Sequence, residues 1–516
     1  MVEILVINYM STTLRVIKNT SYLYIKMALT IFISLYTTRI ILDVLGTSDF
    51  GIYNIIGGAI VLLGFLNSTM ANATQRFMSY AEGKRDLLNK KKVFNVSLAL
   101  HIAVAIATVV LLSFAALFFF NGVLNIPPSR IFAAKVIYFS MLVSTAFTIL
   151  NVPYDAVMNA HENMLYYSLI GVLDSVLRLI VALFCIYTSH DKLIIYGILI
   201  ASIPFITLSI TKVYCHKKYE ECVISIYKYW DLSMAKQITS FFSWNFLTAI
   251  SSIASFYGMG IVLNHFFGTL LNAAQGIANQ INGQMSNLSL NLMKAVNPII
   301  VKRAGSNDIG AMNRATLLSG KFSTLLIVLF AIPFILEINY ILQLWLVNVP
   351  QWTPLFCSMQ LIVTIICQMA SSSSTAIYAE GHIKWYAIYK SIMNALPVIL
   401  AFFVFYLGAA PYWSYIFMIL IWAIGGDVVI VYYSHKQCAQ KKRDFLFCVV
   451  LPVVEIVSLM LAGGLIVKIM MKPCFVRLVL TCVSTSFLFF ISVWLLALNK
   501  LQRKMLIDFL KTKIHR

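Results

Sequence analysis

The chain alternates between apolar runs of about 20 residues and short polar loops, and no polar stretch is as long as a soluble domain. A helix of that length spans the hydrocarbon core of a bilayer. The pattern therefore predicts an all-α polytopic membrane protein with about fourteen spans. The predicted spans lie near residues 20–43, 51–80, 93–120, 130–153, 164–187, 193–215, 237–264, 273–300, 316–340, 354–378, 385–408, 412–434, 446–470 and 475–497.

Two stretches of sequence recur at fixed offsets, one of 222 positions and one of 219 positions. The recurrence predicts a tandem duplication of a six-helix unit. Because six is an even number, both copies enter the membrane from the same side, which predicts a parallel repeat with two lobes. The matched residues are Gly46 with Gly268, Gly83 with Gly305, Asp86 with Asp308, and Ala160-His161-Glu162-Asn163 with Ala379-Glu380-Gly381-His382.

Lys and Arg gather in every second loop, which predicts that these loops and both termini face the cytoplasm. The predicted organisation follows from the repeat and the loops. It comprises an N-lobe over 1–215, an inter-lobe linker over 216–236, a C-lobe over 237–434, two further helices within 435–497, and a basic amphipathic tail over 498–516.

The composition excludes several classes of protein. Hydrophobic residues make up 60% of the chain and charged residues 11%, so the net charge of +20 lies in short loops and indicates membrane topology, not nucleic-acid binding. The nine cysteines form no CxxC pair, and no Walker loop, HExxH or GxSxG motif is present. We therefore expect no enzyme activity, no cofactor and no metal site.

The span over 273–300 carries the densest polar pattern of the chain, with spacings of four, three, four and three that place the residues on one helix face. Amides suit sugar hydroxyls and a lysine suits an anion, which predicts a substrate-binding face. The alternative is amide bonding between helices, with the lysine reaching the interface. The residues are Gln280, Gln284, Asn287, Asn291 and Lys294, and the repeat partner of Lys294 is Asn72, which we include in the predicted site.

Three more charged residues lie in or near predicted spans. Asp174 and Arg178 are four residues apart in the middle of the span over 164–187, where an isolated charge is costly. They form either an intrahelical ion pair without a transport role or a pair of cavity charges, Asp174 for a coupling ion and Arg178 for substrate. Arg39 either pairs with Asp43, one turn on, or binds a phosphate group.

Several of these stretches resemble one known family. The runs are LYTTRIILDVLGTSDFGIYNIIGGAIVLLGFLNSTMANATQRF over 35–77, IVLNHFFGTLLNAAQGIANQINGQ over 261–284, and AVNPIIVK over 295–302. They resemble Wzx-type flippases for polysaccharide and O-antigen units, members of the multidrug, oligosaccharidyl-lipid and polysaccharide (MOP) exporter superfamily. Similar sequences often have Arg near position 275, where this chain has Gln275.

The resemblance implies a MATE-like, V-shaped transporter in the bacterial inner membrane. It would move a polyprenyl-pyrophosphate-linked oligosaccharide to the periplasmic leaflet by alternating access, for capsule, lipopolysaccharide or O-antigen synthesis. We expect a monomer whose partners are this substrate, membrane lipids and other polysaccharide-export proteins. A cation-coupled multidrug exporter of the MATE type is the alternative. A membrane glycosyltransferase ranks last, because the outward loops are short.

Overall fold

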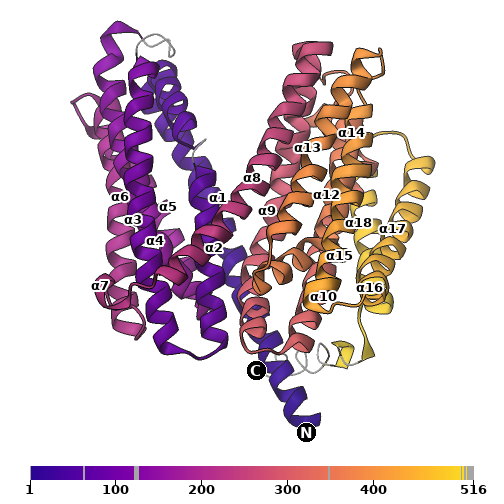
Figure 1. Cartoon of the computed structure of the whole chain (residues 1–516). Helices are drawn as coiled ribbons and strands as arrows, with labels where there is room; N and C mark the ends of the chain where they lie inside the picture. Colours follow the sequence, from indigo (N-terminus) through magenta and orange to yellow (C-terminus); the bar gives the residue numbers. More distant parts are fainter. Residues whose placement is uncertain are drawn as a thin grey trace. The chain divides into compact units, whose positions relative to one another are not determined.

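The structure, a computed structural model, describes residues 2–61, 64–120, 127–346, 349–500, 502–504 and 507. The described residues are almost entirely helical and contain no strand. Figure 1 shows the helices as long rods joined by short connections. The all-α fold predicted from the apolar runs is therefore confirmed. Most of the predicted tail over 498–516 lies outside the described residues.

The long helices follow the predicted spans closely, and several are continued by a short π-helical turn. In chain order the elements are α1 (Val2–Val61), α2 (Gly64–Gly83), α3 (Leu87–Phe118), η2 (Pro128–Arg130), α4 (Ile131–Ala160), α5 (Met164–Tyr187), α6 (Lys192–Lys218), α7 (Ile226–Tyr229), α8 (Leu232–Phe267), α9 (Thr269–Gly305), α10 (Ile309–Leu336), α11 (Ile338–Trp345), α12 (Thr353–Glu380), α13 (Lys384–Tyr406), α14 (Trp413–Phe417), η3 (Met418–Gly425), α15 (Gly426–Cys438), α16 (Lys442–Phe445), η4 (Leu446–Val450), α17 (Leu451–Met470), α18 (Phe475–Ser492) and η5 (Val493–Ala497).

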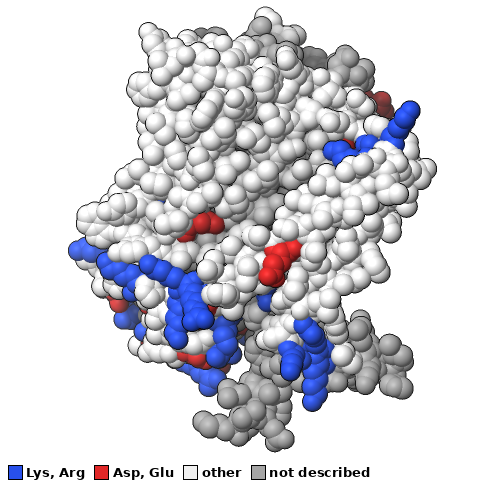
Figure 2. Space-filling view, turned by 90° about the vertical axis from the view of Figure 1, so that its right-hand side faces the viewer, with Lys and Arg blue, Asp and Glu red and all other residues white. Residues whose placement is uncertain are grey.

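Within the described ranges, twelve helices are long and apolar enough to cross a membrane, against the fourteen predicted. The two predicted spans outside this set are 51–80, which covers the end of α1 and most of α2, and 273–300, which lies in α9. The described residues of both regions are helical, but their amides and other small polar residues lower the mean hydropathy. These two helices are the most polar of the predicted spans. Figure 2 shows most of the Lys and Arg of one face gathered toward its lower end.

The backbone confirms the duplication. Gly46 ends the first span with φ of +72°, and its repeat partner Gly268 separates α8 from α9 with φ of +78°. Only glycine adopts this conformation without strain, which explains why both copies have it here. Gly46 also marks the turn predicted inside α1, where two helices meet at a kink.

The connections after α2 and α9 also match at the offset of 222. Arg85 and Asn307 both have positive φ, of 55° and 57°. The next residue caps the following helix in each copy, because the carboxylates of Asp86 and Asp308 accept the backbone N–H three residues on, each at 3.0 Å. The same backbone turn is therefore built twice from different side chains.

The chain divides into two compact units. The N-terminal unit comprises Arg15–Phe246 and the short segment Val301–Ser306. The C-terminal unit comprises Met1–Leu14, Leu247–Ile300 and Asn307–Arg516. The segment Val301–Ser306 is thus the end of α9 that packs with the N-terminal unit.

Each unit has its own apolar core. In the N-terminal unit α4 packs against α2, α3 and α6, around buried residues that include Ile137 and Tyr138. In the C-terminal unit α10 packs against α12, α17 and α18. A buried ion pair joins the turn between α10 and α11 to α18 there, because Arg477 Nη2 donates to Glu337 Oε2 at 2.6 Å.

Candidate functional site

The polar face predicted on α9 is present and largely exposed. Gln280, Gln284 and Asn287 are exposed, whereas Asn291 and Lys294 are half-buried. In the described part of the chain, Gln280, Gln284 and Asn287 donate no side-chain hydrogen bond to another helix. The Asn291 amide donates within α9, to the carbonyl oxygen of Asn287 at 3.1 Å.

The opposite side of α9 uses its amides in a different way. The carboxamide oxygen of Asn282 accepts a hydrogen bond from Thr364 of α12, and that of Asn297 accepts one from Thr375 at 3.3 Å. Amide bonding between helices therefore occurs, but it involves these half-buried positions. Exposed amides at membrane depth must contact water or a polar ligand, because lipid offers them no partner. The face of Gln280, Gln284 and Asn287 is thus suited to a wet interior.

The matching position in the first copy is also polar. Asn72 of α2 is exposed, although its repeat partner is the charged Lys294. Gln275, by contrast, lies inside the first turns of α9 and is 3% exposed. The turn before α9 is at Gly268, seven residues earlier in the chain. Gln275 packs in the core of the C-terminal unit and does not present its amide at the surface.

Asp174 and Arg178 form the intrahelical ion pair that the sequence analysis kept open. Arg178 Nε donates to Asp174 Oδ2 at 2.8 Å, with the side chains 41% and 31% exposed. The pair is therefore accessible, and each of its two charges neutralises the other. Arg39 of α1 is exposed, and the contacts of the described residues include no ion pair between it and Asp43. The interpretation of Arg39 as an ion-pair partner of Asp43 is therefore not supported.

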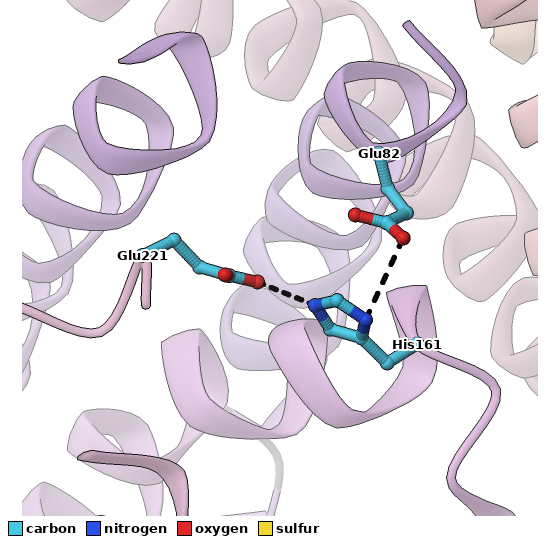
Figure 3. A group of neighbouring side chains, drawn as sticks. All are labelled: Glu82, His161 and Glu221. Carbon is cyan, nitrogen blue, oxygen red and sulfur yellow. Dashed lines mark hydrogen bonds and ion pairs between the residues drawn. The ribbon is translucent and has the colours of Figure 1, made fainter. Parts of the chain in front are cut away.

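The structure also assembles a charged cluster that sequence reasoning missed (Figure 3). His161, in the turn after α4, lies between Glu82 at the end of α2 and Glu221 after α6. The His161 Nε2 atom is 2.5 Å from Glu221 Oε1, and Nδ1 is 3.5 Å from Glu82 Oε1. Lys90 of α3 contacts the other oxygen of each carboxylate, at 2.7 Å from Glu82 and 3.8 Å from Glu221.

The four side chains form a closed ring of charge, which we call the clamp (Glu82, Lys90, His161 and Glu221). Since each ring nitrogen of His161 faces a carboxylate, only the doubly protonated ring donates to both. Burial alone would raise the pKa of Glu221, but the hydrogen bond from His161 and the charge of Lys90 hold it below its ordinary value.

The clamp also contains a possible metal-ligand set. Glu82, His161 and Glu221 each offer one ligand atom, and these atoms lie within 4.8 Å of one another. A metal ion would have to displace the Lys90 ammonium from both carboxylates. Lys90 therefore already supplies a positive charge to both carboxylates of this set.

Next to the clamp, the end of α9 is fixed to the N-terminal unit. Lys302 Nζ lies 2.8 Å from Glu162 Oε1, whose side chain is 6% exposed. The backbones also approach closely, because a Cβ on Gly83 would overlap the main chain of Lys302, and one on Gly305 would overlap that of Tyr80. Shifting Tyr80 and Gly83 by 222 positions gives Lys302 and Gly305. The contact is thus reciprocal between equivalent residues of the two copies.

One signal in the sequence pointed to this region. The stretch Ala160-His161-Glu162-Asn163 was identified as one half of a repeat match. The residues that its side chains contact, however, lie far away in the sequence. His161 reaches Glu221 and Glu162 reaches Lys302, separations of 60 and 140 residues. No spacing rule for a single helix could have found these pairs.

Comparison with known proteins identifies the fold. No protein-family profile and no curated protein matches the chain. Solved structures do match, among them "MATE in the bent conformation" with a TM-score of 0.70 and 15% identity, covering 84% of this chain and 97% of that one. An outward-facing multidrug resistance MATE family transporter of the MOP superfamily matches with a TM-score of 0.69 and 16% identity, over 83% and 96%.

A third match has a binding pocket of different character. It is a MOP superfamily transporter from Pyrococcus furiosus Vc1, described by the reverse polarity of its binding pocket, which suggests a different function. Its TM-score is 0.67 at 15% identity, with 83% of this chain and 96% of that chain covered. At these identities the matches show the fold. The chain is a multi-pass membrane protein with the fold of MATE transporters.

Proposed function

We propose that this protein flips a polyprenyl-pyrophosphate-linked oligosaccharide from the cytoplasmic to the periplasmic leaflet of the bacterial inner membrane. The observation that carries the proposal is the exposed amide face of α9, formed by Gln280, Gln284 and Asn287. A glycan crosses hydrocarbon only if its hydroxyls are solvated, and amides both donate to and accept from hydroxyls. The transporter fold supplies the scaffold for such a face, and alternating access is the proposed mechanism.

Cations would bind the pyrophosphate of the substrate. Arg39 is exposed without an acidic partner among the described residues, and Lys294 adjoins the amide face. Both suit an anion, although a lysine acts as a point charge and an arginine as a bidentate donor. Arg178 is a weaker candidate, since Asp174 already holds its guanidinium. The proposed roles are therefore glycan for the amides and pyrophosphate for Arg39 and Lys294.

The fold alone does not separate this function from export of small cationic drugs. The matched proteins include a multidrug resistance transporter and one with a pocket of reverse polarity, so the chemistry of the pocket has to decide. A pocket for cationic drugs needs acidic and aromatic residues. The proposed face carries amides and a lysine.

The test is deletion of the gene in its host, followed by extraction of membrane lipids. We expect a complete oligosaccharide-pyrophosphate-lipid to accumulate while surface glycan disappears. The wild-type gene should reverse both effects. Arg39→Ala, Lys294→Ala and Gln284→Leu should fail to do so at normal protein levels. The matched control is Lys236→Ala, which removes an exposed lysine at the start of α8 that is not among the proposed binding residues.

Two other outcomes would reject the proposed function or the assigned binding residues. Normal glycan and lipid intermediates in the deletion strain, with raised sensitivity to cationic dyes, would reject the flippase and support the drug exporter. Complementation by all three variants would leave the flippase in place but reject the assigned binding residues.

A further inference from the structure

A polar cavity lies in the N-terminal unit, on residues other than those of the amide face of α9. It has a volume of about 510 Å³ and is bounded by the start of α5, the end of α6 and the residue after it. The walls come from Asn163 and Tyr166 on one side, and from Tyr214, Lys218 and Tyr219 on the other. A cavity of this volume is in the range that accommodates a small ligand or headgroup.

The aromatic walls are held in place by specific contacts. The rings of Tyr166 and Tyr214 stack with centroids 3.5 Å apart and an interplanar angle of 9°. The Asn163 amide donates to the hydroxyls of both Tyr214 and Tyr219, at 2.7 and 2.9 Å. Tyr219 in turn stacks on His161 of the clamp, at 4.4 Å. Because each phenol oxygen accepts from Asn163, its own O–H remains a donor. The cavity is therefore built before any ligand binds.

The charge of the cavity favours an anion. Lys218 is exposed, and its ammonium lies 5.9 Å from the centroid of the Tyr214 ring. The described residues that line the cavity include no carboxylate. The acidic side chains behind it, Glu82 and Glu221, already contact Lys90 and His161. A lysine and phenol hydroxyls together suit a phosphate group.

An apolar rim distinguishes a lipid from a free anion. Leu165 and Leu169 also line the cavity, lie one turn apart on α5, and are 44% and 55% exposed. They fall in the first turns of the membrane span Met164–Tyr187, while Lys218 and Tyr219 lie at the adjacent polar end of α6. The polar part of the cavity is therefore at the interface, and its apolar part follows the hydrocarbon.

We propose that this cavity binds the phosphate headgroup of an anionic phospholipid. Lys218 and the phenols contact the phosphate, and an acyl chain lies along Leu165 and Leu169. Tyrosine at the interface and basic pockets between membrane helices are the features by which proteins hold such headgroups. This inference is independent of the flippase proposal, because the site lies on other residues and recognises a bulk lipid.

The experiment measures lipid retention by the purified full-length protein with native mass spectrometry. The probes are phosphatidylglycerol and, for comparison, phosphatidylcholine of the same chain length. We expect phosphatidylglycerol adducts to dominate, and Lys218→Ala to lower their occupancy about fivefold or more. The matched control is the exposed neighbour Lys217→Ala, which does not line the cavity and should retain the lipid.

A second variant guards against a folding artefact. Tyr166→Phe keeps the stacked ring but removes a hydroxyl, so it should weaken retention without lowering the thermal unfolding midpoint. Equal retention by Lys218→Ala and wild type would overturn the proposal, as would equal loss in Lys217→Ala. Displacement of the lipid by millimolar inorganic phosphate or glycerol phosphate would reject the role of the apolar rim. Displacement by undecaprenyl pyrophosphate at equimolar concentration would show that the site belongs to the transported substrate.

Discussion

Substituting Gly83 or Gly305 by alanine should release the end of α9 from α2. A Cβ at Gly83 would overlap main-chain atoms of Lys302, and a Cβ at Gly305 would overlap main-chain atoms of Tyr80. A flexible side chain could relieve such an overlap by changing its rotamer, but a main-chain atom cannot. The helices must separate, and the nearby Lys302–Glu162 ion pair must stretch with them.

The magnitude follows from two opposing effects. Overpacking of this kind costs about 1–3 kcal/mol. Replacing glycine by alanine in a helix returns up to about 1 kcal/mol, although less at a helix end. Subtracting this return leaves a net cost of about 0–2 kcal/mol, so opening of the contact should become up to about 30-fold more frequent. Local hydrogen exchange of Val301–Ser306 should report this opening.

The assay is hydrogen–deuterium exchange of peptides that cover Val301–Ser306, together with the thermal unfolding midpoint. The control is Gly276→Ala on the same helix, since a Cβ there meets nothing within 4 Å. The control should leave exchange unchanged and stabilise the protein slightly. Gly83→Ala and Gly305→Ala should both accelerate exchange, by similar factors because the contact is reciprocal. Unchanged exchange in both variants, or acceleration in the control as well, would refute the reasoning.

Three further predictions concern charged groups. Glu337→Gln should cost about 3 kcal/mol, because it leaves the buried Arg477 without a counter-charge, and a lower thermal midpoint would show it. The pKa of Glu221 lies below its ordinary 4.5, so its stabilising contribution is full above that pH and is lost as the pH falls through the lowered value. Glu221→Gln should therefore lower the midpoint at pH 7 and flatten its decline in acid; an unchanged acid profile would contradict this. Asp174→Asn should slow lipid-linked oligosaccharide flipping if Asp174 binds the coupling ion, and an unchanged rate in proteoliposomes would exclude that role.

Much of the fold was predictable because membrane helices obey a simple length rule. Twelve predicted spans correspond to sufficiently apolar helices, with ends that differ by a few residues. The differences have a physical cause, since polar end turns such as Leu87–Lys92 continue α3 beyond its apolar part. The break at Gly46 was also predictable, because a glycine between two apolar runs permits positive φ.

The candidate site was predictable only where its residues share one helix. The face on α9 follows from helical spacing, and so does the Asp174–Arg178 pair, four residues apart. The clamp was not predictable, because Glu82, His161 and Glu221 come from the end of α2, the turn after α4 and the segment after α6. Periodicity describes a single element, whereas this cluster depends on how the connections of several helices meet.

The duplication offers a way to find such clusters. Both copies keep the backbone features that shape the connections, at the Gly46 and Gly268 turns and at the Asp86 and Asp308 caps. Features present in both copies therefore belong to the scaffold. The charges of the clamp are different, because the same offsets place mostly uncharged residues in the second copy. At the positions of Glu82, Lys90, His161 and Glu221 the second copy has Ala304, Met312, Glu380 and Gln440.

A partly buried cluster of charged side chains carries a desolvation cost that the second copy avoids. Since the second copy builds the same turns without these four residues, the fold does not require them. The clamp is thus a difference between copies of one scaffold. The charged Lys294 at the position equivalent to Asn72 is another such difference. Such differences are where the function of a duplicated transporter is to be sought, because the two copies share everything that folding alone demands.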